Sequence, residues 1–300
     1  MVSLEKDGLD RTLSVAPMLD WTDRHCRYFH RLLAPSALLD TEMVTTGAII
    51  HGDEDRHLAF KAEEHPLALQ LGGSDPADLA RCARIAEARG YDEVNLNLGC
   101  PSDRVQRGSF GACLMLEQDL VADCIKAMRD AVDIPVTVKT RLGVDEHYSY
   151  DFISGFVNRL AQTGCTVFVM HARKAYLSGL SPRQNRDVPP LNYEWVYQLK
   201  REMQDLEIVI NGGIDSLQHV EKHLECVNGV MIGRAAYQNP WLLAECQQRY
   251  IGPAGIVDRE QAVHEMTAYV EEQVRQGVAV KHISRHMLGL FQGLPGAKAW

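Results

Sequence analysis

The feature that most limits the possible folds is a series of short apolar runs along the first 232 residues. Several runs are rich in valine, isoleucine and leucine, which is typical of parallel strands buried on both faces. We predict eight strands, over Leu13–Ala16, Ala37–Asp40, Leu67–Leu71, Glu93–Leu98, Pro135–Thr140, Val167–His171, Glu207–Asn211 and Gly229–Ile232.

Stretches with helical periodicity lie between most of these runs. In Asp75–Gly90 the apolar residues recur on one face and the final glycine ends the pattern, and Asp119–Val132 has similar spacing. Repeated alternation of strand and helix indicates an α/β protein, a (β/α)8 TIM barrel. A doubly wound sheet is the alternative, but no GxGxxG motif follows the first strand. We assign residues 1–250 to the barrel.

The pattern changes after the barrel. The sequence Ile-Gly-Pro-Ala-Gly at residues 251–255 interrupts it, and Asp258 is a suitable N-cap for a new helix. We therefore predict a small C-terminal helical domain over residues 256–300. The helices expected in this part of the chain, including the last helix of the barrel, cover residues 241–250, 258–276 and 282–291.

Composition limits the cellular compartments and the classes of partner to be expected for this protein. The sequence has 46% hydrophobic and 24% charged residues, and no run of about 18 apolar residues predicts a membrane span. Residues 1–13 lack the apolar core of a secretory signal, and the eight cysteines include no CxxC pair. We therefore expect a cytoplasmic protein with reduced thiols and no metal site. The net charge of −9 argues against a nucleic-acid partner unless a local basic surface offsets it.

Two glycine-rich loops follow the last two predicted strands. They read Asn211-Gly212-Gly213 and Gly233-Arg234. Barrel enzymes often bind phosphate at these strand ends, because glycine lets backbone N–H groups approach phosphate oxygens and arginine adds a fixed positive charge. Tight turns would explain either loop alone, but the two together favour a phosphate site.

Other strand ends carry residues that suit a flat, polar ligand. They are Ala16-Pro17-Met18 after the first strand, and then Gln70, Lys139 and His171. A glutamine amide can pair with a heterocycle, and a lysine can face the electron-rich edge of a flavin. Each residue alone could be a satisfied core or surface residue. Together with the phosphate loops, they predict the wall of a flavin mononucleotide (FMN) site.

The predicted fourth strand is the most informative. It alternates apolar residues with Asn95 and Asn97, and two buried amides on one face need hydrogen-bond partners. Cys100 follows between a glycine and a proline, and residues 102–111 suit a mobile loop over the barrel mouth. A free cysteine is most often a small buried hydrophobe, as we interpret the other seven. Its position at a strand end makes Cys100 the candidate for chemistry.

The motif Asn95-Leu96-Asn97-Leu98-Gly99-Cys100-Pro101 resembles the signature of the tRNA-dihydrouridine synthases. The resemblance runs from about residue 13 to residue 300. Matches to the same family follow in order at Ala16-Pro17-Met18, His171-Ala172-Arg173, Asn211-Gly212-Gly213 and Gly233-Arg234. Further stretches are similar to the A-type subfamily, which modifies positions 20 and 20a of the tRNA D-loop; they are residues 20–24, 41–47, 179–182 and 292–296.

This resemblance implies an FMN-dependent oxidoreductase that uses NADPH to reduce uridine in tRNA to 5,6-dihydrouridine. Hydride would pass from N5 of FMN to C6 of the uridine, and Cys100 would supply the proton at C5. A thiol with an ordinary pKa of about 8.5 is mostly protonated at pH 7 and can act as a general acid. The uridine must leave its base stack to reach the barrel, and Asn97 is our candidate to bind it.

The best local candidate for a tRNA contact is the stretch from residue 171 to residue 186. It has no acidic residue and four permanent cations, namely Arg173, Lys174, Arg183 and Arg186. A solvated loop is the competing interpretation. Relatives in the family continue past residue 297 into a basic helix that helps to hold tRNA, whereas this sequence stops at Trp300. We therefore expect the helical tRNA-binding domain to be truncated.

Three other functions remain open at this point. An FMN barrel that reduces free pyrimidines would share the flavin site but would need no basic stretch. An aldolase with Lys139 as a Schiff-base nucleophile would be colourless. A non-catalytic tRNA chaperone would bind tRNA without needing Cys100. Flavin absorption at about 370 and 450 nm would separate the flavoproteins from the others.

Overall fold

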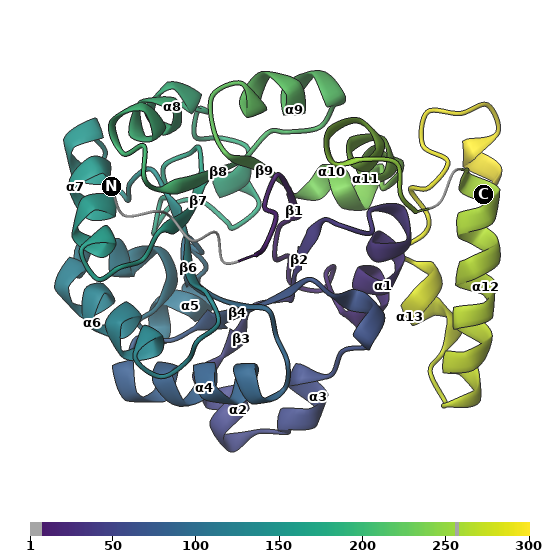
Figure 1. The fold of residues 1–300 in the computed structure, drawn as a ribbon, viewed down its shortest axis with the longest axis horizontal. Coiled ribbons are helices and arrows are strands. Elements are labelled where there is room, and N and C mark those ends of the chain that lie inside the picture. Colours follow the sequence, from purple (N-terminus) through teal and green to yellow (C-terminus); the bar gives the residue numbers. More distant parts are fainter. Residues whose placement is uncertain (1–7, 256–257) are drawn as a thin grey trace.

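The structure, a computed structural model, describes residues 8–255 and 258–300. Residues 1–7, which our barrel assignment includes, and residues 256–257, where we expected the C-terminal domain to begin, lie outside the described residues. Figure 1 shows a ring of helices around a central set of strands, with the C-terminal helices packed against one side.

The strands form one closed parallel barrel. Neighbours pair in the order β2-β1-β9-β8-β7-β6-β5-β4, and β2 pairs with β4 to close the ring. The two-residue strand β3 (Val44–Thr45) pairs with the end of β4. The predicted (β/α)8 barrel is therefore confirmed. Its strands are β1 (Leu13–Val15), β2 (Leu38–Asp40), β4 (Leu67–Gly72), β5 (Glu93–Leu98), β6 (Val136–Arg141), β7 (Val167–His171), β8 (Glu207–Asn211) and β9 (Gly229–Ile232).

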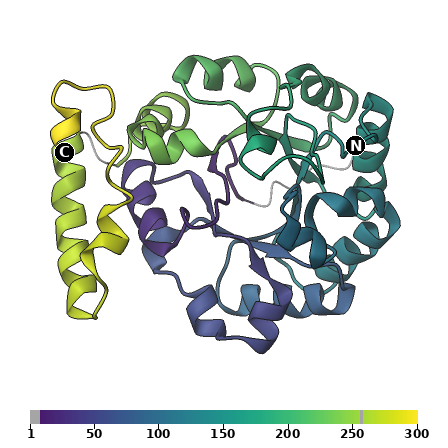
Figure 2. The same ribbon diagram turned by 180° about the vertical axis from the view of Figure 1, so that it is seen from behind.

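Helices cover the outside of the barrel, as Figure 2 shows from behind. Local capping sets their bounds. Asp75 caps α4 through a bond from the backbone N–H of Asp78, and the chain leaves this helix at Gly90 with a φ of 91°. The outer helices are α1 (Arg24–Leu33), α2 (Thr46–His51), α3 (Glu54–Leu58), α4 (Pro76–Ala88), α6 (Gln118–Arg129), α7 (Tyr150–Ala161), α8 (Tyr193–Glu202), α9 (Leu217–Leu224), α10 (Arg234–Gln238) and α11 (Trp241–Cys246).

The C-terminal segment begins with the long helix α12 (Arg259–Arg275), which Asp258 caps as predicted. The next helix, α13 (Val280–Ser284), ends much earlier than the helix we predicted over residues 282–291. The following residues form turns with hydrogen bonds between residues three apart, such as the bond from the N–H of Leu290 to the carbonyl of Met287. The chain packs closely against the barrel here, because a Cβ at Gly289 would lie 2.4 Å from the carbonyl oxygen of Gln238.

Candidate active site at the barrel mouth

A small apolar floor closes the inside of the barrel below the carboxyl ends of the strands. Ala16, Val169, Val209 and Met231 form this buried cluster, and the half-buried Met18 packs against it. Ala16 and Met18 thus lie where the sequence predicted an apolar surface for a flat ring. Pro17, between them, is also half-buried.

A chain of amide side chains crosses the next layer. Gln70 donates to the Oδ1 atom of Asn95 at 2.8 Å and accepts from the Nδ2 atom of Asn97 at 2.7 Å. Asn95 in turn donates to the hydroxyl of Thr137 at 2.9 Å. The predicted need of both asparagines for partners is therefore confirmed. Gln70 and Asn97 each retain one amide hydrogen for a further acceptor.

The same chain positions Cys100. The Oδ1 atom of Asn97 accepts hydrogen bonds from the backbone N–H groups of Gly99, at 3.1 Å, and Cys100, at 3.0 Å. The Cys100 thiol is half-buried, with its Sγ atom 3.5 Å from the Ser102 hydroxyl. An amide network that begins inside the barrel thus fixes the backbone that carries the thiol.

The segment after Cys100 folds back on it. The segment over residues 102–111, which we expected to be a mobile loop over the barrel mouth, contains the short helix α5 (Asp103–Arg107), which Ser102 precedes. Gly111 has a φ of 78°, and a Cβ there would lie 2.5 Å from the carbonyl oxygen of Cys100. Only glycine fits this approach without movement of the backbone. Gln106 also donates to the carbonyl of Leu177 at 2.6 Å, which ties this segment to the chain after β7.

Positive charges converge on His171. Burial lowers the pKa of His171 well below its ordinary value, and the nearby charges of Arg141, Lys139, Arg173 and Arg186 lower it further. The Nδ1 atom of His171 is buried without a hydrogen-bond partner. Burial, together with the charge of Arg141, also lowers the pKa of Lys139 to about 8. A neutral imidazole surrounded by cations suits an anionic ligand.

The two predicted phosphate loops lie side by side. Strand pairing sets His171 beside Asn211 and Asn211 beside Met231. The side chain of Asn211 accepts from Lys139 at 3.2 Å and donates to the Met231 carbonyl at 2.8 Å. Gly212 and Gly213 both have positive φ, at 109° and 71°.

Arg234 and Arg173 do not point freely into solution. Arg234 forms an ion pair with Asp187 at 2.6 Å, and Arg173 donates to the backbone carbonyls of Asp187 and Pro189. Gly233 lies just before Arg234. A Cβ added at Gly233 would lie 3.8 Å from the Cβ atom of Ala16. A phosphate at these loops would therefore meet Arg234 beside a competing carboxylate.

The basic stretch divides into two parts. The Lys174 ammonium lies over the ring of Tyr176 at 4.2 Å, so this cation is already held against an aromatic face. Arg183 and Arg186 are exposed, and neither forms an ion pair within the described residues. These two arginines are the better placed of the four predicted cations to meet an outside polyanion.

Two buried charged residues were not identified from the sequence. Arg141 is buried and donates to the carbonyls of Gly99, at 2.9 Å, and Asn185, at 2.8 Å, so it joins the loop of the thiol to the basic stretch. Asp40 is 2% exposed, and both its carboxylate oxygens lack a hydrogen-bond partner. Burial raises the pKa of Asp40 well above its ordinary value, and the charge of Glu93 adds to this. For Arg141 the sequence did contain a signal. Arg141 lies two residues after Lys139 on the same strand, so both side chains point to the same face.

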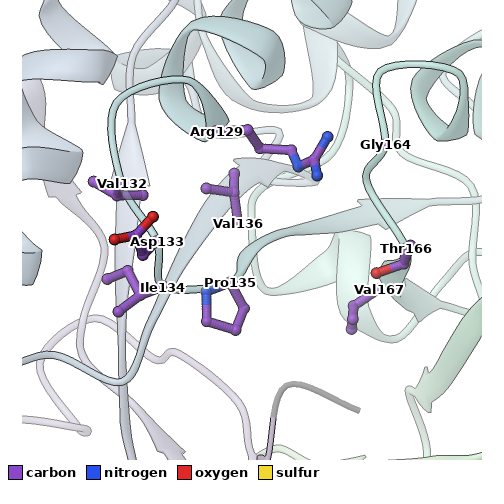
Figure 3. A pocket seen from close by; sticks show the side chains of 9 residues that line it. All are labelled: Arg129, Val132, Asp133, Ile134, Pro135, Val136, Gly164, Thr166 and Val167. Atoms are coloured by element: carbon purple, nitrogen blue, oxygen red, sulfur yellow. The ribbon is translucent and has the colours of Figure 1, made fainter. Parts of the chain in front are cut away.

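A depression of about 180 Å³ lies at the opposite end of the barrel (Figure 3). Its walls include the starts of β6 and β7, so it is remote from the strand ends where barrel enzymes act. Within the described ranges, no group of three His, Cys, Asp or Glu side chains is arranged to hold a metal ion. No helix among these residues is long and apolar enough to cross a membrane.

The fold and the mouth define a (β/α)8-barrel enzyme with a cationic site and a fixed thiol. A family model described as dihydrouridine synthase matches residues 14–300. Similar proteins include the tRNA-dihydrouridine(20/20a) synthases of Shewanella oneidensis (59% identical, over 99% of this chain and 88% of the relative), Vibrio cholerae (61%, over 96% and 88%) and Escherichia coli K12 (61%, over 96% and 84%). The chain belongs to the dihydrouridine synthase family, which confirms the resemblance of its motifs.

Proposed function

We propose that this protein reduces uridine to 5,6-dihydrouridine in the D-loop of tRNA, at positions 20 and 20a. The observation that carries the proposal is the thiol of Cys100 at the rim of a cationic barrel mouth, on a backbone whose N–H is bound by Asn97. The names of the similar proteins support both the reaction and the two positions.

FMN is the cofactor that the mouth fits best. The apolar floor offers a surface to a flat ring, and Gln70 and Lys139 offer hydrogen-bond donors at its edge. Asn211, the three loop glycines and Arg234 offer one phosphate site. His171, with its buried free nitrogen, adds a polar partner on the same side. When reduced by NADPH, FMN supplies the hydride for C6 of the uridine.

Cys100 supplies the proton at C5. The thiol must become a thiolate as it gives up its proton, and nearby cations stabilise that charge. Lys139, Arg141 and Arg186 all interact electrostatically with Cys100. The remaining amide hydrogen of Asn97 is available to a carbonyl oxygen of the extruded uracil.

tRNA binding is assigned to two surfaces. Arg173, Lys174, Arg183 and Arg186 lie on the segment after β7, and Arg183 and Arg186 there are exposed. The C-terminal segment, which we predicted over residues 256–300, is the second surface, and we assign it the role of a small tRNA-binding domain. A local basic surface of this kind can serve a polyanion although the whole chain has a net charge of −9.

The purified protein tests this proposal. It should be yellow and release FMN on denaturation, and it should form dihydrouridine in unmodified tRNA when NADPH is added. Chromatography of the released flavin and of digested tRNA measures both. Release of FAD, or of no flavin, would contradict the cofactor. Reduction of free uracil instead of tRNA would indicate a free-pyrimidine reductase, and tRNA binding without reduction would indicate a chaperone.

A further inference from the structure

Leu19 is a large apolar side chain that the fold leaves in solvent. It is 66% exposed, and it directly follows Met18, which packs on the apolar floor of the mouth. A single exposed leucine is ordinary on a protein surface, but Leu19 lies next to the floor of the site, where a substrate that reaches the floor would cover it. If the proposed function is correct, the partner that reaches this rim is a folded D-loop.

The turn that carries Leu19 is rigid. The carbonyl of Met18 accepts hydrogen bonds from the N–H groups of Trp21, at 3.0 Å, and Thr22, at 2.9 Å. Asp20, at the tip, adopts a φ of 65°, and its N–H is bound by the Glu42 carboxylate at 2.5 Å. A residue other than glycine in this conformation is unfavourable unless its surroundings hold it. The turn therefore presents Leu19 in a fixed direction at a small cost in backbone strain.

The turn is also backed from behind. The Trp21 ring stacks on Tyr237 of α10, with ring centroids 4.4 Å apart. Asp23, two residues later, forms an ion pair with Arg285 at 2.7 Å and contacts the imidazole of His286 at 3.0 Å, and both contacts join the start of α1 to the C-terminal segment (Figure 1). Contacts with both the barrel and the C-terminal segment therefore hold the turn in place when a ligand contacts Leu19.

We propose that Leu19 is an intercalating residue that enters the base stack of the tRNA D-loop in the place vacated by the extruded uridine. Extrusion leaves a gap in the stack, and an apolar side chain that fills it offsets the loss of base stacking. The leucine gains burial only in the complex, so its contribution appears at the step that exposes the uridine. Leu19 is thus a positioning residue that never touches the reacting atoms.

Fluorescence of 2-aminopurine tests this directly. The probe replaces the base next to the target uridine in an assembled tRNA, and its emission rises when the neighbouring stack opens. The oxidised holoenzyme is titrated without NADPH, so no turnover occurs. Wild type should raise the emission, and Leu19→Ala should reduce the amplitude several-fold at saturation. Leu19→Met, which keeps the volume, should restore it. Leu116→Ala, which removes a leucine that is 43% exposed just before α6, is the matched control and should keep the full amplitude.

Turnover on two substrates separates this role from general damage. Leu19→Ala should lower kcat/KM on folded tRNA by about tenfold, the loss expected for a leucine no longer buried. A short single-stranded oligonucleotide with one uridine has little stack to open, so the variant should match wild type there. Equal amplitude and equal turnover on folded tRNA would overturn the inference. Wild type that does not bind tRNA would overturn the proposed function, and this inference with it.

Discussion

The two ends of the barrel treat buried charge in opposite ways. At the amino end of the strands, Arg11 bonds to Glu93 at 2.7 Å and to Glu207 at 3.2 Å. At the carboxyl end, the four cations around His171 form no ion pair within the part of the chain that the structure describes. Charge that is matched inside the protein maintains the fold, and charge left unmatched is available to a ligand.

The largest expected effect is on the rate of tRNA reduction, from substitution of Cys100 at the carboxyl end of the strands. Hydride transfer from NADPH to the flavin needs no thiol, so Cys100→Ala should reduce its flavin at a near-normal rate. The proton at C5 is then missing, and reoxidation by tRNA should slow by about 10²–10⁴-fold. Cys100→Ser should also be slow, because a hydroxyl is a much weaker acid. Stopped-flow absorbance at about 450 nm follows both steps. If Cys100→Ala is reoxidised as fast as wild type, the thiol is only a packed side chain.

Substitutions at the amino end of the strands should change the free energy of unfolding. Glu93→Gln leaves the buried Arg11 without its main counter-charge, which typically lowers the free energy of unfolding by about 3–5 kcal/mol. Urea denaturation measures the loss. Glu207→Gln is the control, because the Glu207 side chain is 26% exposed and should contribute less. If both variants unfold at the wild-type urea concentration, the ion pair does not stabilise the fold and the comparison between the ends fails.

Removal of the Lys139 charge should have the opposite effect on stability. Its folded pKa, about 8, lies below the ordinary value because of burial and the charge of Arg141, so the charged form destabilises the flavin-free protein. This penalty is present below pH 8 and disappears as the pH rises towards 10.5. Lys139→Met should therefore unfold no more easily than wild type at pH 7 without flavin. It should nevertheless bind FMN about ten- to hundredfold more weakly.

The same titration gives Lys139 a pH signature. Wild-type affinity for FMN should fall between pH 7 and pH 9 as the ammonium is lost, and the affinity of Lys139→Met should stay flat over this range. Equilibrium dialysis at several pH values measures both proteins. Arg234→Ala, which removes the expected phosphate contact, should bind more weakly at every pH. Unchanged flavin affinity in both variants would show that the pocket lies elsewhere.

The smallest effect is expected on the outer rim. Arg183→Ala with Arg186→Ala should weaken tRNA binding and reduce the slope of log affinity against log salt, by about one unit for each phosphate that the protein no longer neutralises. Lys174→Ala is the contrast, because its ammonium already lies over Tyr176. Filter binding at several salt concentrations gives the slopes. A double variant with the wild-type slope would identify the stretch as a solvated loop.

The barrel itself was predictable from the sequence. Eight apolar runs matched eight strands to within a residue or two at each end, because strands buried on both faces are apolar throughout. The C-terminal turns were not predictable: residues 285–291 have helical spacing, but their approach to α10 and α11 prevents a helix. Tertiary contacts overrode local propensity there.

The sequence predicted which of the site residues lie together, but not which of them are hydrogen-bonded to each other. Gln70, Asn97, Lys139 and Asn211 do come together, yet the sequence did not show that Gln70 and Asn97 bond to each other. Nor did it show that Asp187 would form an ion pair with Arg234, because the two residues are 47 positions apart in the chain. Such contacts depend on which strands are neighbours and how side chains meet across the barrel. Spacing along one strand contains no such information.

The cationic mouth in a protein of net charge −9 has a consequence for the way molecules meet. A polyanion that approaches this protein meets a net negative charge at long range and cations at the barrel mouth at short range, so an approach to the mouth is favoured over other orientations. Collisions elsewhere are brief, and few RNA molecules remain bound in unproductive orientations. The acidic exterior therefore contributes to selectivity by limiting where RNA can stay.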